Sequence, residues 1–278
     1  MIDTGTVGVW APEPDAADVP EVARTLEALG YGTLWIGGSP AHDLAAAEAA
    51  LAATERLVVA TGVATIWAGP AAALAARHRE LVDRYGHRFL LGLGASHAPL
   101  IGDAYRRPYS AMVDYLDALD VAPEPVPTDE RVLAALGPKM LTLAATRAAG
   151  AHPYLVTPEH TRQAREVLGE GPLLAPEQKV VVGTDPAEAR GIARGVLRMY
   201  LQLPNYVRNL LRLGFTDDDV AGDGSDRLVD ALVAWGTPEQ IRARIAEHHA
   251  AGADHVAVQA LGTGGIPYDQ WRALAPTG

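Results

Sequence analysis

Short apolar runs alternate with longer amphipathic segments along almost the whole chain. The short runs predict strands, and the longer segments, whose apolar residues recur at the spacing of a helix face, predict helices between them. Parallel strands need crossover helices, so this alternation predicts an α/β fold with a parallel sheet. About eight strands suit a (β/α)8 TIM barrel, the first interpretation; a doubly wound open sheet is the second. The predicted strands are Thr6–Trp10, Thr33–Ile36, Leu57–Thr65, Arg88–Leu93, Val132–Leu136, His152–Val156, Lys179–Val182 and His255–Ala260.

Residues typical of helix N-termini precede several of the predicted helices, which supports the alternation of strands and helices. In a capping box, a side chain at the helix start and another three residues later satisfy each other's backbone N–H groups. Three pairs have this spacing, namely Asp18 and Glu21, Asp185 and Glu188, and Thr237 and Gln240. Proline follows the first residue in the last two pairs, which strengthens the prediction of a helix start there.

One segment interrupts the alternation. Residues 204–235 hold two sets of apolar residues at helical spacing around an acidic, glycine-containing turn. The sets are Val207, Leu210 and Leu211, and then Leu228, Leu232 and Val233. We expect two helices that form an insertion before the last βα unit of a single domain spanning residues 1–278.

Two helices open with proline directly after an apolar run, at Gly137-Pro138 and at Thr157-Pro158. A glycine N-cap has no side-chain oxygen, so the N–H groups of the first turn after Gly137 stay open to an outside acceptor such as a phosphate. The Thr157 hydroxyl can cap its own helix or donate to the same ligand. The two junctions indicate a phosphate-bearing cofactor; the alternative is that proline simply starts helices efficiently.

Composition narrows the class of protein. The chain has 278 residues, 49% of them hydrophobic, no cysteine and a formal net charge of −11. The acidic charge disfavours nucleic acid as a partner, and the lack of cysteine excludes disulfides, thiolate–metal sites and a cysteine nucleophile. Since no membrane span or signal peptide is recognised, a soluble cytoplasmic protein without a membrane partner is expected. A phosphate site needs local cations, for which the candidates are Arg106, Arg107, Lys139 and Arg147.

The order of several longer motifs resembles a known family. They are TLWIGG, ERLVVATGVATIWAG, FLLGLGASHAPL, LGPKM, HPYLVTPEHTRQAREVLG, LPNYVRNLLRLGF, SDRLVDALVAWGTPEQI and AGADHVAVQ. In this order they resemble the bacterial luciferase-like monooxygenase superfamily and, more narrowly, its branch of oxidoreductases that use the deazaflavin coenzyme F420. The resemblance implies a TIM barrel with an insertion region, a flavin or deazaflavin at the C-terminal face of the barrel, and a homodimer.

The resemblance also implies a cofactor site. Members of the family commonly hold a non-prolyl cis peptide bond behind the cofactor ring, in a motif that corresponds here to Gly62, Val63, Ala64 and Thr65. The loop that lines the cofactor cleft corresponds to Gly94, Ala95, Ser96 and His97. The phosphate loop corresponds to Ala135, Leu136, Gly137 and Pro138, and the adjoining loop to Thr157, Pro158 and His160.

Trp10 and Trp35 end the first two strands and are candidates to wall the ring pocket, because aromatic faces suit a planar conjugated ligand. Core packing is the alternative for each. Several deazaflavin-dependent relatives have an acidic residue and a histidine just after the second strand, where this chain has Gly38-Ser39. Ser39 could orient a substrate, but a hydroxyl is a poor acid. His97 is therefore the candidate acid–base residue, with a structural hydrogen bond in its loop as the alternative.

No metal site is predicted. Asp217-Asp218-Asp219 has no histidine or glutamate nearby to complete a coordination set, so it is interpreted as a solvated helix start. The first strand, TVGVW, lacks the histidines of metal-dependent hydrolases built on barrels. The run after Gly92 lacks the third glycine of a dinucleotide-binding turn, which disfavours NAD.

These observations predict an F420-dependent oxidoreductase that transfers a hydride between the deazaflavin and an unidentified small organic substrate. One alternative is an FMN-dependent monooxygenase on the same scaffold. Another is a cofactor-free paralogue with a binding or structural role, which the missing histidine after the second strand favours. We also expect the alanine-rich segment His42–Thr54 and the segment Leu74–Arg84 to form an isologous homodimer interface, as in the family.

Overall fold

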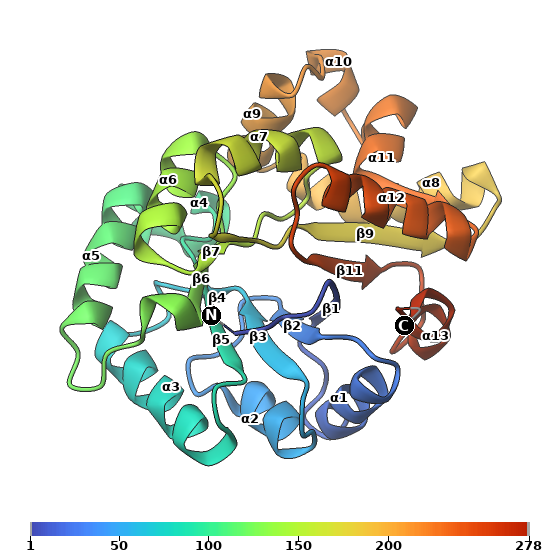
Figure 1. The fold of residues 1–278 in the computed structure, drawn as a ribbon. Helices are drawn as coiled ribbons and strands as arrows, with labels where there is room; N and C mark the ends of the chain where they lie inside the picture. Colours follow the sequence, from blue (N-terminus) through green and yellow to red (C-terminus); the bar gives the residue numbers. More distant parts are fainter. Residues whose placement is uncertain (1, 277–278) are drawn as a thin grey trace.

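The computed structural model describes residues 2–276, which form an α/β fold around one curled sheet (Figure 1). The pairings between its named strands are all parallel, as the alternation predicts. The strands follow the order β10-β9-β11-β1-β2-β3-β5-β6-β7-β8, and β4 pairs with β5 outside this path. Their bounds are β1 Val7–Pro12, β2 Thr33–Gly37, β3 Val58–Gly62, β4 Ala64–Thr65, β5 Phe89–Gly94, β6 Arg131–Leu133, β7 Gly150–Ala151, β8 Leu173–Leu174, β9 Glu177–Val182, β10 Val233–Gly236 and β11 Val256–Ala260.

Helices surround the sheet on its outer side (Figure 1). Their bounds are α1 Val19–Ala28, α2 Ala45–Ala52, α3 Ala71–Tyr85, α4 Ala98–Ile101, α5 Pro108–Asp120, α6 Pro138–Arg147, α7 Pro158–Leu168, α8 Pro186–Tyr200, α9 Pro204–Arg212, α10 Asp217–Val220, α11 Asp226–Leu232, α12 Pro238–Ala250 and α13 Tyr268–Leu274. Two short 3-10 helices span Gly102–Ala104 and Thr128–Glu130. No helix of the described residues is long and apolar enough to cross a membrane.

The two ends of the sheet approach each other through the segment 173–182. Its first part, β8, pairs with β7, and its second part, β9, pairs with β11. Between the two parts, the Ala175 N–H donates to Ala151 O over 2.9 Å, and Pro176 O accepts from the Ala257 N–H over 2.9 Å. The sheet therefore curls back on itself, which is consistent with a TIM-barrel-like fold.

Two predicted strands lie earlier in the chain than expected. The strand predicted at His152–Val156 is formed instead by Gly150–Ala151, and the one predicted at Val132–Leu136 is Arg131–Leu133. Pro153 has no N–H to continue the ladder, and Leu155 has a φ of +56°, so the chain turns out of the sheet there.

The segment 204–235 holds more elements than predicted. Three helices, α9, α10 and α11, replace the expected two, and residues from Val233 onward form strand β10. The helical prediction for Val233 and its neighbours was wrong, because their backbone pairs with β9 from Lys179 onward. That this segment is an insertion stays a prediction.

The predicted helix starts have different outcomes. Thr237 and Gln240 form the complete capping box, and the Asp185 carboxylate accepts from the N–H groups of Ala187 and Glu188. The prediction for Asp18 was wrong, because its backbone is helical and its side chain makes no capping hydrogen bond, whereas an N-cap side chain reaches inward from an extended backbone.

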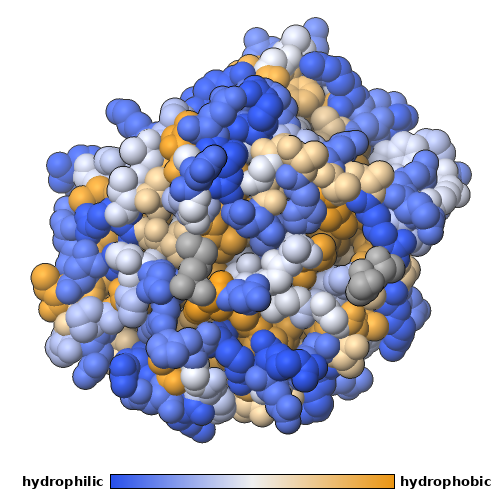
Figure 2. All heavy atoms as spheres, in the orientation of Figure 1, coloured by the Kyte–Doolittle hydropathy of each residue, from blue (hydrophilic) through white to orange (hydrophobic). Residues whose placement is uncertain are grey.

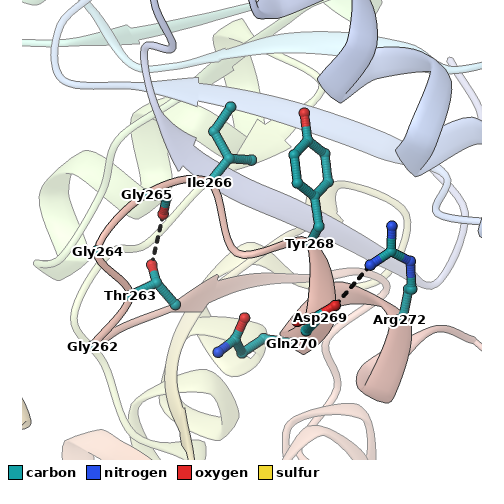
Figure 3. Close-up of a pocket in the computed structure, with 9 residues that line it drawn as sticks. All are labelled: Gly262, Thr263, Gly264, Gly265, Ile266, Tyr268, Asp269, Gln270 and Arg272. Carbon is teal, nitrogen blue, oxygen red and sulfur yellow. Dashed lines mark hydrogen bonds and ion pairs between the residues drawn. The ribbon is translucent and has the colours of Figure 1, made fainter.

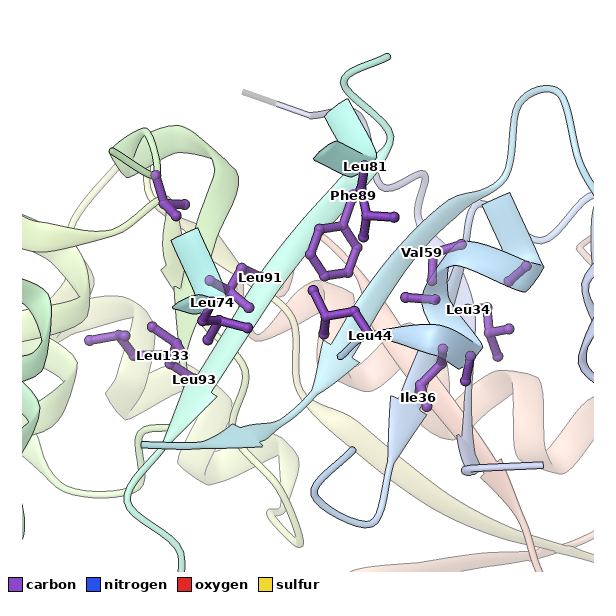
Figure 4. Packing of buried hydrophobic residues seen from close by; sticks show 14 of the residues in the cluster. Leu34, Ile36, Leu44, Val59, Leu74, Leu81, Phe89, Leu91, Leu93 and Leu133 are labelled. Atoms are coloured by element: carbon purple, nitrogen blue, oxygen red, sulfur yellow. The ribbon is translucent and has the colours of Figure 1, made fainter. Parts of the chain in front are cut away.

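The main hydrophobic core lies between the first strands of the sheet and the helices outside them. Side chains of β2, β3 and β5 such as Leu34, Val59 and Phe89 pack there against Leu74 and Leu81 of α3 (Figure 4). On the outside, hydrophilic residues cover most of the face in Figure 2, and hydrophobic ones show mainly between them.

Candidate active site

A cavity of about 700 Å³ opens at the carboxyl ends of the strands. Residues that directly follow β2, β3, β5 and β6 line one side of it, as Gly38, Val63, Ala95 and Ala134 do. The end of α8 and three residues of α9, Asn205, Tyr206 and Arg212, also line it. Parallel α/β sheets bind their ligands at this edge, so the cavity lies where an active site is expected.

One wall of the cavity is built around the bond between Gly62 and Val63, which is a cis peptide bond. Trp10 Nε1 donates a hydrogen bond to Gly62 O over 2.9 Å. Glycines allow this close packing: a Cβ on Gly37 would lie 2.0 Å from the Trp10 ring, and a Cβ on Gly94 would lie 2.6 Å from Val63. The wall therefore consists largely of closely packed backbone.

A second corner of the cavity lies at the start of α6. Gly137 is the N-cap in an extended conformation, Pro138 follows it, and the N–H groups of Met140 and Leu141 donate to Gly137 O. The Lys139 N–H has no partner within the helix, as expected of a first-turn donor. Arg212 of α9 lies opposite, with Nη1 3.5 Å from the position of a Cβ on residue 137.

The charge of this corner is positive. Lys139 and Arg212 both line the cavity, and none of the described residues that line it is Asp or Glu. Of the cations proposed from the sequence, Lys139 is here, whereas Arg147 is bound to Asp117 and Asp120 elsewhere. Arg106 and Arg107 are not among the lining residues. The helix start and the cations together favour an anion such as phosphate.

Most of the predicted site residues line this one cavity. They are Trp10, Gly62, Val63, Thr65, Gly94, Ala95, Ser96, His97, Ala135, Leu136, Gly137 and Pro138, with Ser39 beside them. The structure thus brings together five places that are far apart in the sequence.

Five predicted positions are not among the lining residues: Trp35, Ala64, Thr157, Pro158 and His160. Thr157 caps its own helix by accepting from the His160 N–H, which is the first of the two roles considered for its hydroxyl. The His160 ring contacts Leu136 O over 2.9 Å, so it supports the loop before Gly137 from behind. Burial lowers the pKa of His160, so this imidazole is neutral at neutral pH.

Trp35 belongs to the core. Its side chain is fully buried and stacked on the His152 ring at 4.1 Å, and its Nε1 donates to His255 Nε2. Trp35 is buried because it points into the interior of the curled sheet. Of the two readings for this residue, core packing is the one that the structure supports.

His97 lines the cavity with one ring nitrogen already paired. Its Nδ1 lies 3.1 Å from Asn205 Oδ1, and since an amide oxygen only accepts, Nδ1 carries the proton and Nε2 is left as an acceptor. Burial lowers the pKa of His97, against a smaller opposing effect of the bond to Asn205. His97 is thus a neutral imidazole suited to take up a proton.

The sequence prediction missed a group of tyrosines on the far side of the cavity. Tyr154, Tyr200 and Tyr206 line it with their rings in mutual contact. Tyr154 was assigned to a strand, although its position just after Pro153 at a strand end was a signal for a loop. Arg212 was missed as well, because nothing local connects it to Gly137.

A second hollow, of about 440 Å³, lies at the glycine-rich loop between β11 and α13 (Figure 3). Thr263 Oγ1 donates to Gly265 O, and Arg272 is paired with Asp269. The charges of this hollow are therefore balanced within α13, next to the loop. No group of residues that could hold a metal ion is found in the part of the chain that the structure describes, and Asp217–Asp219 begin α10 behind a Thr216 cap.

Residues 2–122 and 118–255 match the model of a family described as luciferase-like monooxygenase. No curated protein matches the chain.

Several solved structures share the fold. An F420-dependent secondary alcohol dehydrogenase in complex with an F420–acetone adduct is 17% identical, with a TM-score of 0.73 over 98% of this chain and 97% of that chain. The coenzyme F420 dependent tetrahydromethanopterin reductase from Methanopyrus kandleri is 16% identical, with a TM-score of 0.76 over 97% and 96%. The oxygenating constituent of 3,6-diketocamphane monooxygenase from Pseudomonas putida, in complex with FMN, is 15% identical, with a TM-score of 0.67 over 97% and 94%.

Proposed function

Because the chain belongs to the luciferase-like monooxygenase family, we propose that it is an oxidoreductase that binds coenzyme F420 and acts on a small organic substrate. The observation that carries the proposal is that one cavity combines a closely packed backbone wall at Gly62–Val63 and a cationic helix start at Gly137. A planar ring and a phosphate that belong to one molecule match these two features. When bound, the deazaflavin would supply or accept the hydride.

The residues of each feature receive a role. Trp10, Gly62, Val63 and Thr65 support the ring, and the loop Gly94–Ser96 covers its edge. The phosphate is held by the first turn of α6 after Gly137, with Arg212 and Lys139 as counter-charges. Trp35, Ala64, Thr157, Pro158 and His160 act from behind, by packing and by fixing the loops.

His97 is proposed as the acid–base residue. Its neutral ring would take the hydroxyl proton of an alcohol at Nε2 while Asn205 holds Nδ1, and would return that proton in the reverse reaction. This role matters here because Gly38-Ser39 provide no acid after β2, and Ser39 is left to orient the substrate.

An FMN-dependent monooxygenase is the second candidate, favoured by the same Gly137 corner. FMN also carries a phosphate on a planar ring, and the lining residues offer no feature that only a deazaflavin would use. Titrating the purified protein with F420, FMN and FAD, followed by absorbance and fluorescence, separates the candidates. We expect F420 to bind most tightly; preference for FMN with oxygen consumption supports the monooxygenase, and failure to bind any of them supports a cofactor-free role.

The variant Gly137→Asp tests the phosphate site. Its backbone conformation is open to any residue, and a Cβ there would meet only Arg212 at ordinary contact distance. The carboxylate would cap α6, adding a few tenths of a kcal/mol to stability. It would also neutralise Arg212 and occupy the position of the phosphate.

F420 affinity should therefore fall at least about tenfold, while the melting temperature of the cofactor-free protein holds or rises. Gly137→Ala is the matched control, because it adds bulk without charge and should bind nearly as well as the unmodified protein. If Gly137→Asp binds F420 normally, the phosphate lies elsewhere.

A homodimer also stays part of the proposal. The alanines of α2 that suggested the interface, such as Ala46 and Ala50, are buried within the chain, and Glu48 of α2 is paired with Arg77 and Arg84 of α3. The dimer therefore rests on the family resemblance. Light scattering that gives the 29.3 kDa monomer at micromolar concentration would contradict it.

A further inference from the structure

A charged pair lies inside the curled sheet, behind the tyrosines of the cavity. Glu177 and Lys179 of β9 have fully buried side chains, and Lys179 Nζ donates to Glu177 Oε2 over 3.0 Å. Burial lowers the pKa of Lys179 and raises that of Glu177, while each charge opposes the shift of its partner. A buried ion pair contributes little net stability, because desolvation offsets the attraction, so its contacts indicate what it positions.

Lys179 contacts the ring of Tyr154, and Glu177 contacts the backbone of the next residue. Lys179 Nζ lies 3.6 Å from the centroid of the Tyr154 ring, a cation–π contact, and also 5.2 Å from the Tyr200 ring. Glu177 Oε2 accepts from the Leu155 N–H over 3.1 Å. Leu155 has a left-handed backbone, so Glu177 stabilises the turn that presents Tyr154 to the cavity.

The hydroxyl of Tyr154 joins two further groups. It lies 2.9 Å from the Tyr200 hydroxyl and 2.9 Å from Gln259 Oε1. An amide oxygen only accepts, so Tyr154 gives its one hydrogen to Gln259, and the bond between the tyrosines must use the hydrogen of Tyr200. The Tyr200 oxygen then has a lone pair left for an outside donor. When the Gln259 amide turns over, its NH2 group donates to the Tyr154 oxygen, and Tyr154 donates to the Tyr200 oxygen. The Tyr200 hydrogen is then free to be donated to an outside acceptor.

We propose that Tyr200 binds the reacting oxygen of the substrate, and that the chain from Tyr200 through Tyr154 to Gln259 lets it accept from a hydroxyl and donate to a carbonyl. The inference rests on the proposed function, because a hydride transfer interconverts these two groups. Tyr200 and Tyr154 both line the cavity, and the Tyr154 ring lies 5.1 Å from that of Trp10, which is bonded to Gly62. The tyrosine pair therefore adjoins the proposed ring site.

His97 and Tyr200 have separate tasks in this arrangement. Both rings contact Tyr206, at 5.2 Å and 5.3 Å, from different elements. Burial raises the pKa of Tyr154 and of Tyr200, so both stay protonated and exchange hydrogen bonds only. On binding, the alcohol donates its hydrogen to the Tyr200 oxygen. When that hydrogen turns to His97 Nε2 and passes to it as a proton, the chain of hydrogen bonds reverses, and Tyr200 donates to the oxygen that becomes the carbonyl.

The test uses three ligands with one carbon skeleton: 1-indanol, 1-indanone and indane. Their dissociation constants are measured by calorimetry on the protein without cofactor and with oxidised F420. In the variant Tyr200→Phe, the two oxygen-bearing ligands should bind about threefold to tenfold more weakly, whereas indane binds as before. Tyr115→Phe is the matched control, since Tyr115 is a half-buried tyrosine outside the cavity, and it should change none of the three. Equal losses for all three ligands, or no loss, would overturn the proposal.

A second variant tests the reversal. Gln259→Glu, measured at about pH 9 so that even a buried carboxyl is ionised, ends the chain in a group that can only accept. Tyr200 is then held as an acceptor, so 1-indanol should bind as before and 1-indanone about threefold to tenfold more weakly. Equal effects on both ligands would contradict the reversible chain.

The inference and the proposed function fail separately. Tyr200 is proposed to contact the substrate and is given no contact with the cofactor, so Tyr200→Phe should bind F420 as the unmodified protein does. Loss of F420 binding by the unmodified protein would contradict the proposed function, whereas the comparison of the three ligands without cofactor decides the role of Tyr200. An unmodified protein that does not prefer the oxygen-bearing ligands to indane overturns that role too.

Discussion

Two parts of the sheet bury different kinds of side chain. We call the strands β2, β3 and β5 the apolar side and the strand β9 with its neighbours the polar side. Around β2, β3 and β5, the core consists of aliphatic and aromatic side chains such as Leu34 and Phe89 (Figure 4). On the other side, β9 buries Glu177, Gln178 and Lys179 one after another, each at most 1% exposed. The strands are alike in backbone and in pairing, so the difference lies in what the side chains meet.

On the polar side, nearly every buried group has a particular partner. Gln178 Oε1 lies 2.9 Å from His248 Nε2, and His248 Nδ1 lies 2.8 Å from Thr161 Oγ1. His255 contacts Gly5 O with Nδ1 and accepts from Trp35 with Nε2. An apolar core tolerates changes that preserve volume, whereas a buried polar network tolerates only changes that preserve its pairing. The polar side also adjoins the tyrosines of the cavity, so function is expected to depend on it.

The largest effect is expected from breaking the buried ion pair. Lys179→Met leaves the Glu177 carboxylate buried without its partner, which should lower the free energy of unfolding by about 3–5 kcal/mol. Urea unfolding followed by circular dichroism measures it. Lys139→Met is the matched control, since these are the two lysines of the chain and Lys139 is exposed.

The double variant Glu177→Gln with Lys179→Met should recover most of the loss, because no charge is left buried. If Lys179→Met alone costs no more than Lys139→Met, the polar side is not stabilised by pairing and the contrast between the two sides fails.

On the apolar side, volume alone should set the cost. Leu34→Ala removes a fully buried side chain and should lower the free energy of unfolding by about 2–5 kcal/mol. Ile36→Val on the same strand removes one methyl group and should cost about 0.5–1.5 kcal/mol. The same urea experiment measures both, and a Leu34→Ala protein as stable as Ile36→Val would show that this core is not tightly packed.

The last expected effect is a dependence of stability on pH, which the buried histidines of the polar side should produce. Burial lowers the pKa of His152 and His248 to about 3 and that of His255 to about 4. The unfolded chain takes up protons near pH 6.5 while the folded chain does not. The stability due to these neutral histidines is therefore complete above pH 6.5 and is lost as the pH falls toward 4 and 3.

Each histidine contributes up to about 1.4 kcal/mol per pH unit in that range. Unfolding free energies between pH 6.5 and 4.5 should rise with pH, and His248→Gln should reduce that slope by about one proton. The same slope in His248→Gln and in the unmodified protein would show that His248 is protonated in the folded state.

Much of the fold followed from local patterns. Apolar runs located the strands and periodic segments located most helices, since both depend on residues a few positions apart. The predictions were wrong for segments whose structure depends on a strand that is distant in the sequence. Val233 and its neighbours are a strand because β9 lies beside them, and Gly150–Ala151 are a strand because β6 and β8 flank them.

The candidate site was predicted in part for the same reason. The Gly137-Pro138 helix start and the loops after β3 and β5 could be predicted from the sequence, because each is one short segment at the end of a strand. Trp35 shows the limit: its position at a strand end resembles that of Trp10, but its ring meets His152 and His255 in the interior. Which of two similar tryptophans faces the cavity depends on how the sheet curls.

By itself, the sequence determined the alternation of strands and helices, the open helix start at Gly137 and the order of the family motifs. Only the tertiary structure decided that Arg212 lies opposite Gly137 and that Tyr154 meets Tyr200 and Gln259, which lie 46 and 105 positions further along the chain. Local structure depends on backbone dihedrals and neighbouring side chains, which the chain carries within a few residues. Contacts across the cavity exist only once the sheet has curled and brought distant strand ends to one edge.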